Sequence, residues 1–298
     1  SLVHTSSCAV INAIDAGINF VDTADVYGGG ASERAVGRVV RSRSEDVKVA
    51  TKCGRRLKPH VSESYTPDAM RAFVEDSLRN TGLERLDLIQ LHCTPTDVYY
   101  RPEIFEVFDC MRAEGKIANL GVSVEKVEEA IKATEYDNVA TVQLIYNMFR
   151  HRPAERFFPL AAERNVGTIV RVPLASGMLT GKFDEKSTFE QGDHRYFNRN
   201  GEAFDRGETF SGVDYNTGLT AVRELSERLG NSEPLAALAI RWILMSDHVS
   251  TVIPGASSPE QLAGNVSAAE FPPLTTEQMQ AVREVYDRYI RNPVHYMW

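Results

Sequence analysis

Short apolar runs rich in β-branched residues recur along the chain and alternate with segments of helical period. The apolar runs predict strands at 19–25, 47–53, 86–92, 119–124, 141–147, 168–174 and 251–255. Helical spacing of apolar positions predicts helices at 6–16, 66–80, 125–133, 154–164, 218–229 and 234–246. Regular alternation of strands and helices indicates a parallel sheet covered by helices.

Polar residues at the ends of the strands distinguish two kinds of parallel sheet. Six consecutive strands each end at or near one polar residue: Asp22, Lys52, His92, Ser123, Gln143 and Arg171. One polar group per strand at a common rim is typical of the catalytic face of a (β/α)₈ TIM barrel. A doubly wound dinucleotide-binding sheet would show G-x-G-x-x-G after its first strand, and the cluster Gly28–Gly30 lacks that spacing. We therefore predict an α/β fold of the TIM-barrel type, with residues 1–298 as a single domain.

The strand count falls one short of this prediction. The pattern shows seven strands, and the sequence opens in the helix-like segment 6–16. An eight-stranded barrel needs one more strand before it. We expect that strand, with an N-terminal hairpin, either to be missing from this chain or to lie in a segment whose pattern does not reveal it.

Two segments fall outside the strand–helix repeat. Residues 183–216 are polar and aromatic, and the segment is too long for an ordinary connection. Because it follows a strand, we expect it on the catalytic rim as a lid or binding loop. The aromatic tail 287–298 could fold back over the same rim. The alternative is a disordered linker and a frayed tail.

Composition and charge exclude several classes of function. The chain is 43% hydrophobic and carries a net charge of −8, so it lacks the basic surface expected for nucleic acid or anionic membranes. No apolar run is long enough to span a bilayer, and residues 1–20 lack a signal-peptide pattern. The scattered cysteines show no metal-type spacing and suit a reducing compartment: Cys8, Cys53, Cys93 and Cys110. We expect a soluble cytoplasmic protein without a metal, in an oligomeric state that the sequence leaves open.

Three of the polar residues at the strand ends, together with a tyrosine after the first strand, suit the reduction of a carbonyl group. That reaction needs a hydride source, a proton donor and a group that stabilises negative charge on the oxygen. Tyr27 is the candidate donor, Lys52 is expected to lower the pKa of Tyr27, and Asp22 would hold Lys52 in place. His92 could hydrogen-bond the substrate oxygen. Taken singly, each residue has a structural alternative: a loop cap, an aromatic plug or a core histidine.

Six runs of sequence support this interpretation together: INFVDTADVYGGGASERAVGR, VATKCG, LDLIQLHC, GVSVEK, VPLASGMLTGKF and TVIPGASSPEQLAGN. They resemble the aldo-keto reductases, from about residue 8 to the end of the chain. The resemblance implies a barrel enzyme that binds NADPH across its rim without a Rossmann fold and reduces an aldehyde or ketone to an alcohol. It places the family's catalytic four at Asp22, Tyr27, Lys52 and His92.

Cofactor residues follow partly from chemistry and partly from the resemblance. In the segment 257–261, a serine cap and a proline at the first helical position open a helix, whose N-terminus favours phosphate. The resemblance assigns the adenosine and its 2′-phosphate to Gly255, Ser257, Gln261 and Asn265. It assigns the carboxamide to Ser123 and Gln143, and the pyrophosphate to Leu174, Ser176 and Lys182. Arg171 stands where many members carry an aromatic residue that stacks under the nicotinamide.

Two other functions remain open from the sequence. The same barrel resembles the β subunits of voltage-gated potassium channels, in which cofactor binding serves regulation. Those subunits carry asparagine in place of His92, which favours the reductase. A barrel lyase or aldolase would use Lys52 as a Schiff base and would need neither Tyr27 nor a dinucleotide.

Overall fold

Seven parallel strands form one sheet, in the order in which they occur along the chain. The computed structural model of the protein describes residues 7–230 and 232–298. Its strands are β1 (Phe20–Asp22), β2 (Lys48–Cys53), β3 (Leu86–His92), β4 (Ile117–Ser123), β5 (Val139–Ile145), β6 (Gly167–Arg171) and β7 (Thr251–Val252).

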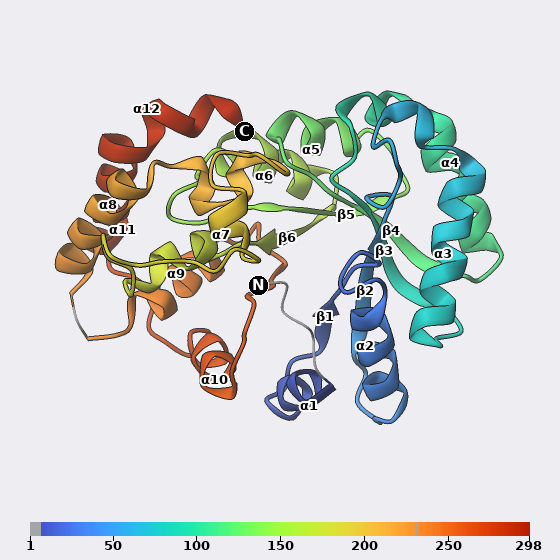
Figure 1. Cartoon of the computed structure of the whole chain (residues 1–298), viewed down its shortest axis with the longest axis horizontal. Helices are drawn as coiled ribbons and strands as arrows, with labels where there is room; N and C mark the ends of the chain where they lie inside the picture. The colour runs from blue at the N-terminus through green and yellow to red at the C-terminus, as the bar shows by residue number, and fades with distance from the viewer. Residues whose placement is uncertain (1–6, 231) are drawn as a thin grey trace.

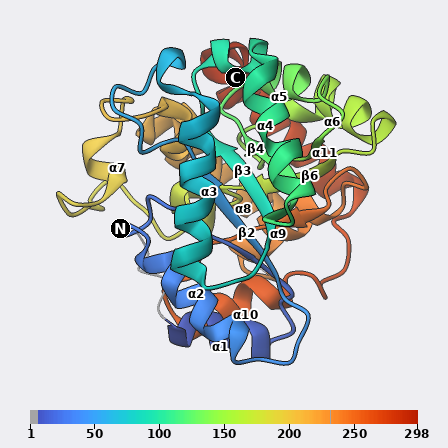
Figure 2. The same cartoon turned by 90° about the vertical axis from the view of Figure 1, so that its right-hand side faces the viewer.

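Helices cover the outside of this sheet (Figure 1). The longer ones are α1 (Ser7–Asp15), α2 (Ala31–Arg41), α3 (Pro67–Thr81), α4 (Pro102–Ala113), α5 (Val127–Ala133), α6 (Pro153–Glu163), α8 (Tyr215–Leu229), α9 (Leu235–Leu244), α10 (Pro259–Ser267) and α11 (Thr276–Val285). Short helical turns include α7 (His194–Phe197), η3 (Ala175–Thr180), η4 (Arg206–Glu208), η5 (Phe210–Gly212), η6 (Tyr286–Ile290) and α12 (Arg291–Val294). Figure 2 shows α3 lying in front of the central strands, with α2 below it. No helix in the described part of the chain is long and apolar enough to cross a membrane.

Local sequence explains where the helices begin and end, as α3 illustrates. The Thr66 side chain accepts a hydrogen bond from the backbone N–H of Ala69, and Pro67 occupies the first helical position. Gly82 ends the helix with φ 66°, a left-handed conformation that costs glycine little. Helix α3 therefore matches the predicted helix to within one residue at each end.

The sheet is strongly curled. Neighbouring strands lie about 4.8 Å apart, so a flat sheet would hold β1 and β5 about 19 Å apart. Instead the Gln143 Nε2 on β5 donates to the Asp22 Oδ2 on β1 over 2.9 Å. The strands thus wrap around a common interior, as in part of a barrel.

Strand alternation divides this interior into two layers. Side chains two apart on a strand share a face, and Ala50, Leu88 and Ile169 form an apolar cluster with Phe20 and Ile253 packed against it. Two residues further along the same strands come polar side chains: Asp22, Lys52, Gln90 and Arg171. The interior is therefore apolar below and polar at the carboxyl ends of the strands.

Comparison with the predicted elements shows which strands and helices the hydrophobic pattern located correctly. All seven strands occur, and β3 has the predicted bounds, whereas β1, β6 and β7 are shorter than expected. Closure into an eight-stranded barrel would need a strand between β7 and β1, and the described residues supply none. The structure therefore supports a curled seven-stranded parallel sheet. Helices α2, α4 and α11 were not predicted.

Of the two segments outside the repeat, residues 183–216 contact the carboxyl-end rim of the sheet, and the tail packs against them. We call residues 183–216 the rim loop; its Glu208 forms an ion pair with Arg171 at the end of β6. The tail ends at Trp298, which is buried against this loop. A Cβ at Gly212, whose φ is 74°, would lie 2.7 Å from the Trp298 ring.

Candidate active site

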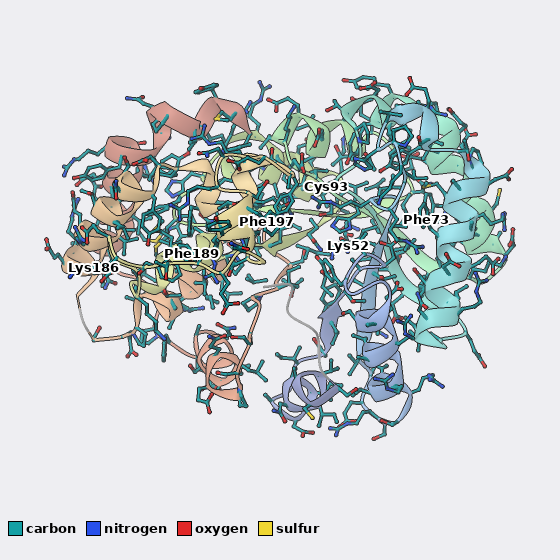
Figure 3. The ribbon with its side chains drawn as sticks, in the orientation of Figure 1. Lys52, Phe73, Cys93, Lys186, Phe189 and Phe197 are labelled. Carbon is teal, nitrogen blue, oxygen red and sulfur yellow. The ribbon has the colours of Figure 1, made fainter. Side chains whose placement is uncertain are left out.

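The centre of the candidate site is a buried ion pair. Lys52, near the end of β2, contacts the Asp22 carboxylate at the end of β1 through its ammonium group. The same ammonium donates to the Thr23 carbonyl over 2.9 Å. Lys52 is only 1% exposed and lies in the middle of the molecule (Figure 3). A buried lysine needs such partners, because an unpaired buried charge costs several kcal/mol.

Three neutral polar side chains complete the surroundings of Asp22. Gln90 and Gln143 donate to the Asp22 Oδ2 over 3.1 Å and 2.9 Å. Ser123 in turn donates to the Gln143 carboxamide oxygen over 3.3 Å. Gly121 leaves room for this arrangement, since a Cβ there would lie 2.2 Å from the Thr141 hydroxyl and 3.2 Å from the Gln90 side chain.

Gln90 is a site residue that the sequence analysis missed. It lies two residues before His92 on β3, so strand alternation places both on the interior face. That spacing could have identified it.

Tyr27 stands beside the ion pair, in the turn after β1. The Lys52 ammonium is 5.4 Å from the centre of the Tyr27 ring. Lys52 is the strongest single influence on the pKa of Tyr27 and lowers it, as expected. However, burial and the carboxylates of Asp22 and Glu208 together raise the pKa of Tyr27 by more than Lys52 lowers it. The net shift is therefore upward. The expectation of a lowered pKa was therefore wrong for the net effect, and Tyr27 holds its proton at neutral pH.

His92 faces the edge of Tyr27. The two ring centres are 6.2 Å apart, at an interplanar angle of 88°. Burial, and after it the positive charges of Lys52, Arg55 and Arg171, hold the pKa of His92 well below its ordinary value. The imidazole is therefore neutral. Its Nδ1 is buried and has no hydrogen-bond partner among the described residues.

Arg171, at the end of β6, is held by the rim loop. Its guanidinium pairs with the Glu208 carboxylate at 2.8 Å and donates to the Val124 carbonyl over 3.0 Å. Glu208 lies close to Glu125 and Cys93, a set of groups that could ligate a metal, but Arg171 also contacts the Cys93 sulfur, at 3.8 Å. A guanidinium thus supplies the positive charge at this cluster. Nothing in the spacing of the loop sequence had indicated Glu208.

Four predicted cofactor residues lie together at the start of α10. The backbone N–H and the hydroxyl of Ser257 both bond the Gln261 carboxamide oxygen, at 2.8 Å and 2.9 Å. The Asn265 carboxamide donates to the Gly255 carbonyl over 3.2 Å. Ser258 caps the helix, with Pro259 at the first position. In contrast to the strand-end cluster, this group is largely exposed.

The remaining predicted cofactor residues follow β6. Leu174 packs against an apolar cluster formed by α9 and by Ala268, which directly follows α10. Ser176 has φ 57°, and its hydroxyl donates to the Glu208 carbonyl over 2.7 Å. Lys182 is exposed. The Ser176 hydroxyl, which the sequence analysis assigned to the pyrophosphate, is thus hydrogen-bonded to the rim loop instead.

These residues fit an extended dinucleotide. The exposed start of α10 offers the Ser257 and Ser258 hydroxyls and a positive dipole end to a phosphate. The unpartnered His92 Nδ1 and the amide-rich cluster around Asp22 lie at the other end of the same rim, where the carboxyl ends of the strands meet.

The fold and the position of the site define a class: an α/β protein whose polar cluster lies at the carboxyl ends of parallel strands. Comparison with known proteins specifies it further. The model of the Aldo/keto reductase family matches residues 5–287. The structure resembles a holo-form aldo-keto reductase from Bacillus halodurans, with a TM-score of 0.77 and 27% identity over 99% of this chain and 93% of that one.

Two further similarities differ in the roles they name. A glycerol dehydrogenase from Gluconobacter oxydans gives a TM-score of 0.75 and 31% identity, covering 98% of this chain and 88% of that one. A Schizosaccharomyces pombe protein provisionally named a voltage-gated potassium channel subunit β is 31% identical, covering 95% of this chain and 84% of the relative. The chain belongs to the aldo/keto reductase family. It is thus an oxidoreductase of a family that uses nicotinamide cofactors and small-molecule substrates.

Proposed function

We propose that the protein reduces an aldehyde or ketone to an alcohol, with NADPH as the cofactor and Tyr27 as the proton donor. The observation that carries the proposal is the convergence of Tyr27, His92 and the buried Lys52–Asp22 pair at one rim. Bound NADPH would supply the hydride. We further propose that the sheet belongs to a single-domain (β/α)₈ barrel and that the protein is cytoplasmic, in keeping with its four free cysteines.

In this proposal the three polar groups have distinct roles. Tyr27 keeps its proton because its pKa is raised, so it can donate that proton to the developing alkoxide. Lys52 then faces the phenolate that remains and stabilises it. His92 is neutral and can donate one hydrogen bond to the carbonyl oxygen, which orients the substrate.

In this proposal the cofactor lies across the rim. The adenosine and 2′-phosphate would be held by Gly255, Ser257, Gln261 and Asn265, and the pyrophosphate by Leu174, Ser176 and Lys182. Ser123 and Gln143 would bind the carboxamide, and the Arg171 guanidinium plane would lie beside the nicotinamide. Because Glu208 holds Arg171 and Ser176 in the structure, the rim loop would shift when the cofactor binds.

The electrostatics of Lys52 do not support a Schiff-base mechanism. Burial disfavours the charged form of Lys52, but Asp22 and Tyr27 outweigh it, and the net pKa of Lys52 is raised. A Schiff-base lysine needs a lowered pKa to act as a nucleophile at neutral pH. The aldolase alternative is therefore disfavoured.

A regulatory role like that of channel β subunits is the second candidate, favoured by the relative of that name. Both roles require cofactor binding, and only the reductase requires turnover. The presence of His92 beside Tyr27 supports the reductase.

The test is the reduction of 4-nitrobenzaldehyde by NADPH, with Tyr27→Phe as the variant. We expect kcat/KM to fall by at least about 10²-fold, the usual contribution of a positioned acid, with NADPH binding retained. The matched control is Tyr100→Phe, a 65% exposed tyrosine outside the site. Wild-type turnover by Tyr27→Phe would contradict the proton-donor role. NADPH binding without turnover of any aldehyde would favour the regulatory role.

A further inference from the structure

Two adjacent arginines follow β2, and within the described part of the chain only Arg56 forms ion pairs. Gly54, with φ 100°, turns the chain after the strand, and a Cβ there would lie 2.8 Å from the Tyr65 ring. Arg56 pairs with Asp25 at 2.8 Å and with Asp76 at 3.0 Å. Arg55 forms no ion pair with any carboxylate in the described residues.

The Arg55 guanidinium lies next to His92, the residue proposed to bind the substrate oxygen. Arg55 Nη1 is 3.5 Å from His92 Nε2, at the outer limit of a hydrogen bond. When the Nε2 of the neutral imidazole carries the proton, both groups are donors and do not hydrogen-bond each other, so both can donate to a third partner. Arg55 is half-buried, where a charge interacts more strongly than in bulk water.

The rim loop holds the arginine from the other side. The Arg55 guanidinium lies 5.4 Å from the centre of the Phe204 ring, a cation–π contact. Phe204 contacts His194 and Phe197 of α7 within the same loop. The plane of the guanidinium is thus supported next to His92.

The nearby acids are already engaged or only partly charged. Burial raises the pKa of Glu208, but the charges of Arg171 and Arg55 outweigh it and hold the net value below the ordinary one. Its carboxylate is committed to Arg171 at 2.8 Å. Burial raises the pKa of Glu125 to about 7. Neither carboxylate therefore neutralises Arg55 at short range.

We propose that Arg55 binds a carboxylate of the substrate, and that the protein prefers carbonyl compounds with an acid group next to the carbonyl, such as 2-oxo acids. The inference rests on the proposed reductase function. The His92 Nε2 and the Arg55 Nη1 lie side by side, which matches the adjacent keto and carboxylate oxygens of a 2-oxo acid. An arginine fork also suits the planar carboxylate.

The proposal changes no chemical step. Bound NADPH would supply a hydride to the carbonyl carbon, leaving NADP⁺, and Tyr27 would donate a proton to the oxygen. The carboxylate leaves unchanged on the product, a 2-hydroxy acid. Arg55 acts on substrate choice by pairing with a charge that a neutral ketone lacks.

The experiment compares phenylglyoxylate with its methyl ester, which differ by one negative charge. We measure the acid-to-ester ratio of kcat/KM for the wild type, Arg55→Met and Arg55→Lys. Loss of one charge-assisted hydrogen bond should lower the ratio in R55M by about tenfold or more. R55K keeps the charge and should retain most of the ratio. Arg112→Met, which breaks an exposed ion pair with Asp109, is the matched control and should leave the ratio unchanged.

A binding measurement on the wild-type protein loaded with NADP⁺ covers the case in which R55M fails to fold. Calorimetry should show mandelate binding about tenfold or more tighter than methyl mandelate. Equal binding of the two, or an unchanged ratio in R55M, would overturn the proposal. If the wild type reduces neither phenylglyoxylate, its ester nor 4-nitrobenzaldehyde, the proposed function itself fails. Turnover of neutral carbonyls with no advantage for the acid overturns the role of Arg55 alone.

Discussion

The two ends of the candidate site are built in opposite ways. Around Asp22, every polar group is buried and each oxygen of the carboxylate has a partner on another strand. Around Ser257, the side chains are exposed and bond to neighbours within the same short segment. The first end is fixed by the whole sheet, and the second by one loop and one helix cap. We infer that the first sets the chemistry and the second tunes cofactor affinity, and that the two respond differently to substitution.

The largest difference should come from Lys52→Met. The change leaves Asp22 charged and buried without its cation, and breaking a buried pair costs about 3–5 kcal/mol. Urea unfolding followed by circular dichroism measures the loss. Arg223→Met removes an exposed ion pair with Glu185 and should cost less than about 1 kcal/mol. Equal stability of both variants would show that the Lys52–Asp22 pair is not part of the structural core.

Cofactor choice tests the exposed end. No lysine or arginine lies between residues 253 and 265, so the 2′-phosphate would depend on hydroxyls and the start of α10, at about 0.3–1 kcal/mol per end effect. We expect NADPH to bind about ten- to a hundredfold more tightly than NADH, measured as paired dissociation constants at moderate salt. Tighter binding of NADH would contradict the assignment. A preference above about a thousandfold would require a basic residue from elsewhere, with Arg195, now paired with Asp193, as the first candidate.

Glu125 lies at the border of the buried region, and its titration should change the free energy of unfolding with pH. Burial raises its pKa to about 7, so the folded state holds a proton that the unfolded state loses near pH 4.5. Stability from this group is therefore present at low pH and lost as the pH rises towards 7. Glu125→Gln should gain roughly 1–2 kcal/mol relative to the wild type between pH 5 and pH 8. A difference that does not change with pH would rule out this titration.

The smallest expected effect is that of Ser258→Ala. It removes the side-chain cap of α10 and should cost about 1 kcal/mol, as caps usually do. We expect NADPH affinity to fall by less than about tenfold while turnover at saturating cofactor stays the same. A large loss of turnover would show that α10 is coupled to the strand-end cluster, and that the two ends are not separate.

The sequence could predict the site residues that strands position, but not those that the rim loop contributes. The convergence of Asp22, Lys52 and His92 was predictable because alternation and strand ends determine where such side chains point. The partners from the rim loop were not, since Glu208 and Phe204 reach the site through a loop conformation that has no period. Arg171 combines a predictable and an unpredictable feature. Its position on the strand was predicted, but its pairing with Glu208 depends on the conformation of that loop. Helix α2 starts after Gly30 without a side-chain cap, so one sequence signal of a helix start is absent there.

The hydrogen bond between Asp22 and Gln143 has a consequence for how the protein folds. Its two residues are 121 positions apart, on strands that do not pair with each other. The bond can form only after five strands have paired and curled, and contacts of such long range are slow to form. Recovery of the intact cluster during refolding should therefore come late, after most helices have appeared. Catalytic competence would then report completion of the sheet, not the formation of any local element.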